Sequence, residues 1–165
     1  MTLTASYLRE MDREALTTRK MLSIVPEDQY DWKPHEKSMT LRQLATHVAE
    51  IPGWVQTVLT TSELDFAKNE YKPLQPENAK VLLEHFENSL EKGRAALRSA
   101  DDKQLDDSWT MRAGDQVFST ESKFDWIRHC FCQVVHHRAQ LGVYLRLLNV
   151  PIPGSYGPSA DETSF

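Results

Sequence analysis

The chain of 165 residues has little of what marks a secreted protein. Its only cysteines are Cys130 and Cys132, and on a helix two residues so spaced point about 200° away from each other. They cannot form a disulfide without breaking the helix, which excludes a disulfide-stapled fold. We therefore expect two free thiols in a reducing, cytoplasmic environment.

Long apolar runs and clusters of positive charge are also missing. No segment approaches the roughly 20 apolar residues that cross a bilayer, and the first residues have neither the basic nor the apolar part of a signal peptide. The formal net charge is -5, and Lys and Arg form no cluster longer than a pair. We expect neither a membrane nor a nucleic acid as a partner.

The composition is that of an ordinary globular protein, with 40% hydrophobic and 26% charged residues and no internal repeat. A chain of this length buries roughly 70% of its unfolded surface around a single core. We therefore expect one domain over residues 1–165.

The period-two alternation of strands is nearly absent, whereas four segments carry the three-and-four spacing of amphipathic helices. The first ends before Pro26, the second begins at a capping box of Thr40 and Gln43, the third extends from Pro76 to about Ser99, and the fourth runs from Ser119 or Ser122 to about Leu148. Pro52 lies inside the second apolar stripe, which resumes in phase, so we expect a kink there and not an end.

The connection over residues 100–121 is long for a helical bundle, and Ala113-Gly114-Asp115 would suit the turn of a small hairpin. The last residues, rich in proline and glycine, predict an extended C-terminal tail. The predicted fold is all-α: a four-helix bundle with this long connection and tail.

An adjacent histidine pair lies in the fourth predicted helix. His137 falls within roughly 30° of the centre of the apolar stripe, whereas His136 points to solvent. Gln133 lies one turn before His137 at the border of the stripe, and His129 lies further toward solvent. His47 has the same border position on the second helix, so His47 and His137 are candidates to meet inside the bundle.

Both a structural and a functional interpretation stay open at this point. A single inward-facing histidine is more often a hydrogen-bonded core residue than a ligand. Cys130 is interpreted as core filler and Cys132 as a surface residue. The side chains of Trp32, Trp54, Trp109 and Trp126 suit either a pocket wall or packing.

Two stretches, SMTLRQLATHVAEIPGW (residues 38–54) and HHRAQLGVYLRLLNVPIPGSYGPSADE (residues 136–162), resemble the signature regions of the DinB/YfiT-like family of metal-dependent four-helix-bundle proteins. The likeness extends over nearly the full chain. It implies a homodimer, and a divalent metal, nickel or zinc, bound by three histidines. Transferred to this sequence, the ligand positions fall on His47, Gln133 and His137.

Gln133 departs from the family pattern, which has a histidine there. An amide oxygen is a harder and weaker donor than a neutral imidazole for such metals. We rank Gln133 or a water as the third ligand, His129 as the second choice, and an empty site as the third.

The resemblance implies an enzyme for a small-molecule substrate, either a transferase that uses a low-molecular-weight thiol as co-substrate or a hydrolase. Glu50, one turn from His47, is a weak candidate for a general base or a partner of the ligand, because the helical wheel points it mainly outward. The alternative is a non-catalytic dimeric bundle whose metal site is degraded at Gln133.

Overall fold

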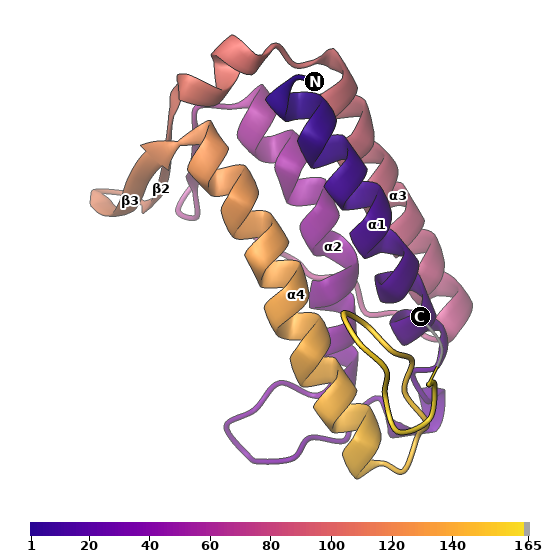
Figure 1. Ribbon diagram of the computed structural model, residues 1–165. Coiled ribbons are helices and arrows are strands. Elements are labelled where there is room, and N and C mark those ends of the chain that lie inside the picture. The colour runs from indigo at the N-terminus through magenta and orange to yellow at the C-terminus, as the bar shows by residue number, and fades with distance from the viewer. Residues whose placement is uncertain (164–165) are drawn as a thin grey trace.

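The computed structural model describes residues 1–163 as four long helices and a small sheet that extends from one side of the helices (Figure 1). The helices are α1 (Leu3–Ser23), α2 (Leu41–Thr60), α3 (Ala79–Ser99) and α4 (Lys123–Leu147), with short 3-10 turns at Glu27–Gln29 and Asp102–Asp106. The strands are β1 (Glu63–Asp65), β2 (Ser108–Ala113) and β3 (Gln116–Ser122). Within residues 1–163, none of the helices has the length and apolar character needed to cross a bilayer.

The four predicted helices are confirmed, and side-chain caps fix where they begin. Thr40 and Gln43 form the expected capping box, with Gln43 N–H donating to the Thr40 hydroxyl at 3.2 Å and Thr40 N–H donating to Gln43 Oε1 at 2.9 Å. Ser122 caps α4. The predicted start of α3 at Pro76 is wrong, because the Asn78 side chain accepts the Val81 N–H at 2.9 Å and so caps the helix there.

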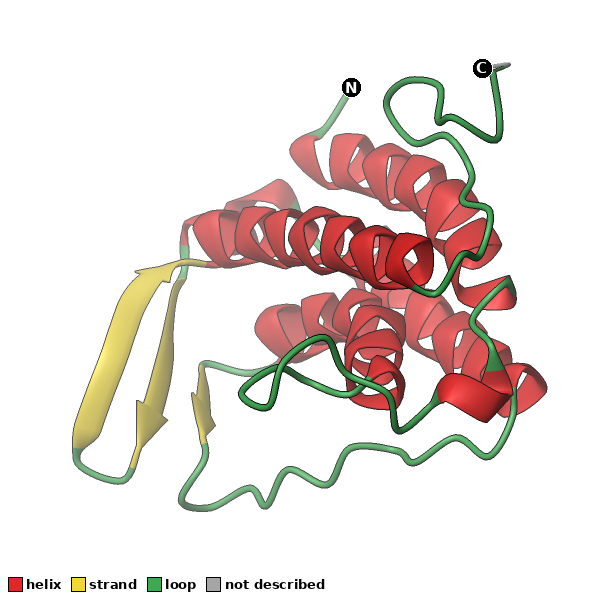
Figure 2. Cartoon of the chain, turned by 90° about the horizontal axis from the view of Figure 1, so that it is seen from below, coloured by secondary structure: helices red, strands yellow, loops and turns green. Residues whose placement is uncertain are grey.

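The all-α class is wrong, because the chain also forms a three-stranded mixed sheet. The hairpin expected in the long connection is β2 and β3, which pair antiparallel across a turn where Gly114 has φ +56°. β1 pairs parallel with β2, so the order is β1-β2-β3 (Figure 2). Three residues are too few to show strand alternation, and the partner of β1 lies far along the chain.

The centre of the bundle is held by a close approach of α2 and α3. Pro52 lies inside α2, which continues through it as expected. A Cβ built on Gly93 of α3 would lie 2.3 Å from the Pro52 carbonyl oxygen and 2.9 Å from Met11 Cε. Glycine at this position is therefore what permits the two helices to pack this closely.

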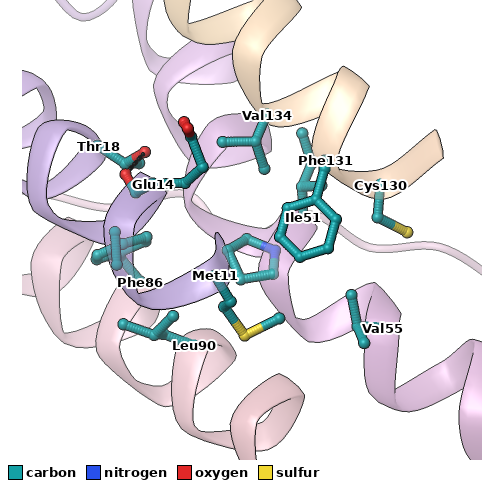
Figure 3. A pocket seen from close by; sticks show the side chains of 12 residues that line it. Met11, Glu14, Thr18, Ile51, Val55, Phe86, Leu90, Cys130, Phe131 and Val134 are labelled. Atoms are coloured by element: carbon teal, nitrogen blue, oxygen red, sulfur yellow. Dashed lines mark hydrogen bonds between the residues drawn. The ribbon is translucent and has the colours of Figure 1, made fainter. Parts of the chain in front are cut away.

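The core between the four helices has little empty space. A void of about 20 Å³ remains among side chains of all four helices, among them Met11, Ile51, Phe86 and Val134 (Figure 3). A void of this size holds about one water molecule. A ligand must therefore bind outside this part of the core.

The tail after α4 is fixed against α1 and α4 by a buried polar group. Arg138 Nη1 lies 2.6 Å from Glu14 Oε2 and donates to the Thr18 hydroxyl at 3.0 Å, and the Arg138 and Glu14 side chains are 3% and 9% exposed. The hydroxyl of Tyr156 in the tail donates a hydrogen bond to Glu14 Oε1 at 2.6 Å.

Up to residue 163 the tail contains no helix or strand, and it passes beside α1 and α4 (Figure 1). The final part of the predicted tail, residues 164–165, lies outside the described residues.

Candidate functional site

His47 of α2 and His137 of α4 lie in contact, as their predicted positions suggested. Their ring centroids are 4.5 Å apart and the ring planes are inclined at 76°. The two helices are direct neighbours in the bundle. Two imidazoles from different helices therefore meet at one point.

The Nδ1 atom of the His47 ring is held by a carboxyl group. His47 Nδ1 lies 2.9 Å from Glu50 Oε1, and the Tyr71 hydroxyl donates to the same oxygen. Glu50 is buried, so the expectation that it points mainly outward is wrong. The loop after β1 brings Tyr71 over this side of α2. With Nδ1 donating to Glu50, Nε2 of His47 keeps its lone pair free to bind a metal.

His137 is placed by two amides of its own helix. Its Nε2 lies 2.8 Å from Gln133 Oε1, and its Nδ1 lies 2.8 Å from Gln140 Oε1. Burial lowers the pKa of His137, aided by the neighbouring His47 and His136 rings, while the bond to Gln140 acts in the opposite direction. A lowered pKa favours the neutral imidazole, which is the form that binds metals.

Gln133 connects the two other candidates on α4. Its Nε2 lies 3.3 Å from His129 Nε2, and its Oε1 faces His137. His129 is therefore separated from His137 by the amide of Gln133. The five predicted site residues and Tyr71 form one continuous series of contacts, which we call the histidine cluster: Tyr71, Glu50, His47, His137, Gln133 and His129.

The remaining candidates lie outside the histidine cluster or are chemically inert. His136 is exposed, as expected. Cys130 is buried and Cys132 is exposed, both with free thiols. Burial raises the pKa of the Cys130 thiol to about 12, so it stays protonated and is no nucleophile at neutral pH.

The histidine cluster fits a divalent metal only with the help of an amide. Within residues 1–163, no three side chains of the His, Cys, Asp and Glu types are grouped to hold a metal ion. The available donors are one nitrogen each from His47 and His137 and Gln133 Oε1. The 2.8 Å between the last two atoms is a hydrogen-bond distance, whereas two ligands of one tetrahedral ion with bonds of about 2.0–2.2 Å lie about 3.4 Å apart, so Gln133 and His137 would have to separate slightly to share an ion. As metal ligands these three groups would bind more weakly than three imidazoles.

A cavity of about 380 Å³ opens beside His47. We call it the tryptophan pocket. It is lined from α2, β1 and the following loop, β2 and α4 by His47, Trp54, Thr57, Val58, Leu64, Phe66, Asn69, Glu70, Tyr71, Trp109, Met111, Trp126, His129 and Cys130. Pockets that bind small molecules have volumes of about 300–1,000 Å³.

Sequence reasoning identified part of this wall. Three of the four tryptophans line the pocket, whereas Trp32 packs against Tyr144 with ring centroids 5.6 Å apart. Tyr71 and Phe66 were missed. They lie on a loop with no periodic pattern, so no signal in the sequence placed them near His47.

The family model described as the DinB family matches residues 1–164. Among solved structures, a DinB-like protein from Bacillus subtilis has a TM-score of 0.69 at 16% identity, covering 97% of this chain and 99% of that one. A DinB-like protein from Bacillus cereus has a TM-score of 0.72 at 20% identity, covering 94% and 98%. A DinB family member from Exiguobacterium sibiricum has a TM-score of 0.63 at 20% identity, covering 90% and 95%. No curated protein matches the sequence.

Proposed function

Because the chain belongs to the DinB family, we propose that it is a metal-dependent enzyme acting on a small molecule in the tryptophan pocket. The observation that carries this proposal is the contact of His137 with His47, with ring centroids 4.5 Å apart, because His47 also lines a cavity of about 380 Å³. His47, His137 and the Gln133 amide oxygen are the ligands, and nickel or zinc is the metal.

The chain's own residues prepare these ligands. Glu50 accepts a hydrogen bond from Nδ1–H of His47, so the lone pair of Nε2 points away from the carboxyl group. Tyr71 donates to the same carboxyl oxygen and limits its movement. A carboxyl group that is hydrogen-bonded to the ring nitrogen not bound to the metal fixes the orientation of a ligand histidine and increases its basicity. Glu50 is thus a positioning residue for His47.

Held by these ligands, a divalent metal would supply a water or thiol of lowered pKa as the nucleophile. Water would support hydrolysis and a low-molecular-weight thiol would support group transfer, and the pocket beside His47 would hold the electrophilic substrate. Screening metal-loaded protein with thiols and electrophilic acceptors, and with ester and amide substrates, separates the two reactions.

Metal analysis tests the proposal directly. Protein purified without a nickel column and then incubated with zinc or nickel should retain close to one equivalent after gel filtration. His137→Ala should lose it, whereas His35→Ala, which changes a histidine in an exposed loop, should not. Less than about one tenth of an equivalent in the wild-type protein contradicts the proposal.

A second candidate is a non-catalytic bundle that has lost its metal. The observation in its favour is the 2.8 Å contact between Gln133 Oε1 and His137 Nε2, which satisfies the imidazole without any ion. Under this alternative, His137→Ala lowers the thermal unfolding temperature, and no metal addition raises that of the wild-type protein.

A further inference from the structure

The tryptophan pocket presents carbon to a ligand along most of its wall. Trp109 donates its Nε1–H to the Thr61 hydroxyl at 2.9 Å, and Trp126 donates its Nε1–H to the Trp109 carbonyl at 3.0 Å. Both indole N–H groups are therefore occupied within the protein. The two rings, with centroids 4.9 Å apart at 67°, have only apolar edges and faces left for a ligand.

Two tryptophans of the wall each lie against a histidine of the histidine cluster. Trp54 lies edge-on to His47 with centroids 5.2 Å apart, and Trp126 lies edge-on to His129 at 5.3 Å. The aromatic wall therefore borders directly on the histidine cluster. A ligand can keep its ring against the tryptophans while its reacting group lies at His47.

Neither Lys nor Arg lines the tryptophan pocket within residues 1–163, whereas Glu70 does. Glu70 itself is paired with an exposed lysine, because the Lys72 ammonium group lies 3.0 Å from Glu70 Oε2. Glu50 lies buried behind His47 and Tyr71. Away from the metal site at His47, an anion in the pocket would lose its hydration and gain no Lys or Arg as a partner.

We propose that the tryptophan pocket binds the uncharged aromatic body of the substrate and discriminates against substrates that carry a carboxylate or phosphate on that body. This deepens the proposed function, because it assigns a substrate class to the same site. The binding itself rests on the wall of the pocket and does not require the metal.

A matched pair of ring compounds tests the proposal: 2-naphthalenemethanol, which is neutral, and 2-naphthoate, which is its anionic counterpart. Binding to the full-length protein is measured by titration calorimetry in the presence of a chelator, so that no bound metal attracts the carboxylate. We expect the dissociation constant of 2-naphthalenemethanol to be at least tenfold lower than that of 2-naphthoate. Equal affinities, tighter binding of 2-naphthoate, or no binding of the neutral probe overturns the proposal.

Two variants locate the binding site. Met111→Trp on β2 fills the pocket and should weaken binding of 2-naphthalenemethanol at least tenfold. Val117→Trp adds the same side chain to an exposed position on β3 outside the pocket and should leave the affinity unchanged. Unchanged affinity of a folded Met111→Trp variant, checked by circular dichroism, places the probe elsewhere and contradicts the proposal. If Met111→Trp does not fold, the comparison of the two probes on the wild-type protein still decides.

The two proposals fail in different ways. If the protein binds 2-naphthalenemethanol but retains no metal, the metal-dependent function is wrong and the aromatic pocket stands. If it retains metal but shows no preference for the neutral probe, the substrate class is wrong and the metal site stands.

Discussion

In the proposed metal site, Gln133 is the weakest of the three donors. Its amide lies between His129 and His137 and contacts both rings. An amide oxygen at this place gives a weaker third donor than an imidazole would, because zinc and nickel favour nitrogen over neutral oxygen ligands. The position is therefore the most informative one to change.

Replacing Gln133 with histidine should complete a three-imidazole site. We expect Gln133→His to bind zinc or nickel at least tenfold more tightly than the wild-type protein, measured by competition with a chromogenic chelator. Gln133→Ala should bind more weakly than wild type. If all three proteins bind alike, residue 133 is no ligand.

Tyr71 should influence the metal through Glu50 and His47. Tyr71→Phe removes the hydroxyl that donates to Glu50, and we expect it to weaken metal binding by less than the roughly 10- to 100-fold that follows the loss of a direct partner of a ligand histidine. Tyr144→Phe is the matched control, because its hydroxyl contacts the Met39 carbonyl, away from the histidine cluster. Equal loss in both variants would indicate a general effect on the fold.

The close packing of α2 on α3 predicts how substitution of a glycine in a helix changes stability. Gly93→Ala places a Cβ 2.3 Å from the Pro52 carbonyl oxygen, which forces the helices apart. We expect a loss of about 1–3 kcal/mol in the free energy of unfolding, measured with urea. Gly142→Ala on α4 is the control: its Cβ meets Met21 Cε at 3.6 Å, so higher helix propensity should leave stability equal or raised by up to about 1 kcal/mol.

The start of α1 is capped from a distant part of the chain. Asp102 accepts the N–H groups of Leu3 and Thr4 at 2.8 and 2.9 Å, and it also accepts the Thr4 hydroxyl. The bond from Thr4 N–H, followed by that from Leu3, lowers the pKa of Asp102. The folded pKa then lies below the unfolded value, so the ionised group stabilises the fold at higher pH, and this is lost as pH falls through the folded pKa.

Asp102→Ala should therefore lower the urea midpoint at neutral pH, and the difference from wild type should shrink in acid, below the unfolded pKa of about 3.9. Asp106→Ala, in the same short turn, should have little effect at either pH. A difference between Asp102→Ala and wild type that stays constant with pH would mean that the carboxylate charge does not contribute.

At this scale the sequence predicted what depends on local signals and missed what depends on distant partners. The capping box at Thr40 and the cap at Ser122 need only neighbouring residues, so the helices they begin could be located. β1 exists because residues 63–65 pair with residues 110–112. Glu50 was misplaced for the same reason, because Tyr71, which covers it, is 21 residues away. The contact between His47 and His137 could be predicted because helical periodicity shows which face of its helix each residue occupies.

For the whole molecule, the expected homodimer remains a prediction. Val143 and Leu147 are 60% and 57% exposed one turn apart on α4, in an apolar stripe beside the tail that also includes Val135 and Ala139. Such a stripe suits a subunit interface. We expect light scattering to give twice the 19.0 kDa of the chain, and Leu147→Glu to give the monomer. Phe118→Glu, on the hairpin, should remain a dimer; a monomeric wild-type protein contradicts the prediction.

The tryptophan pocket takes its walls from two kinds of structure. The histidine cluster lies mainly on α2 and α4, inside the bundle, whereas Leu64, Phe66 and Met111 belong to β1, the loop after it and β2. Leu64 and Met111 are only partly buried and Phe66 is exposed, whereas Trp109 of β2 belongs to the hydrophobic core. Mutations at Leu64, Phe66 and Met111 should therefore change which molecule is accepted without moving His47 and His137. One bundle could in this way diverge toward many substrates while a single inherited chemistry persists.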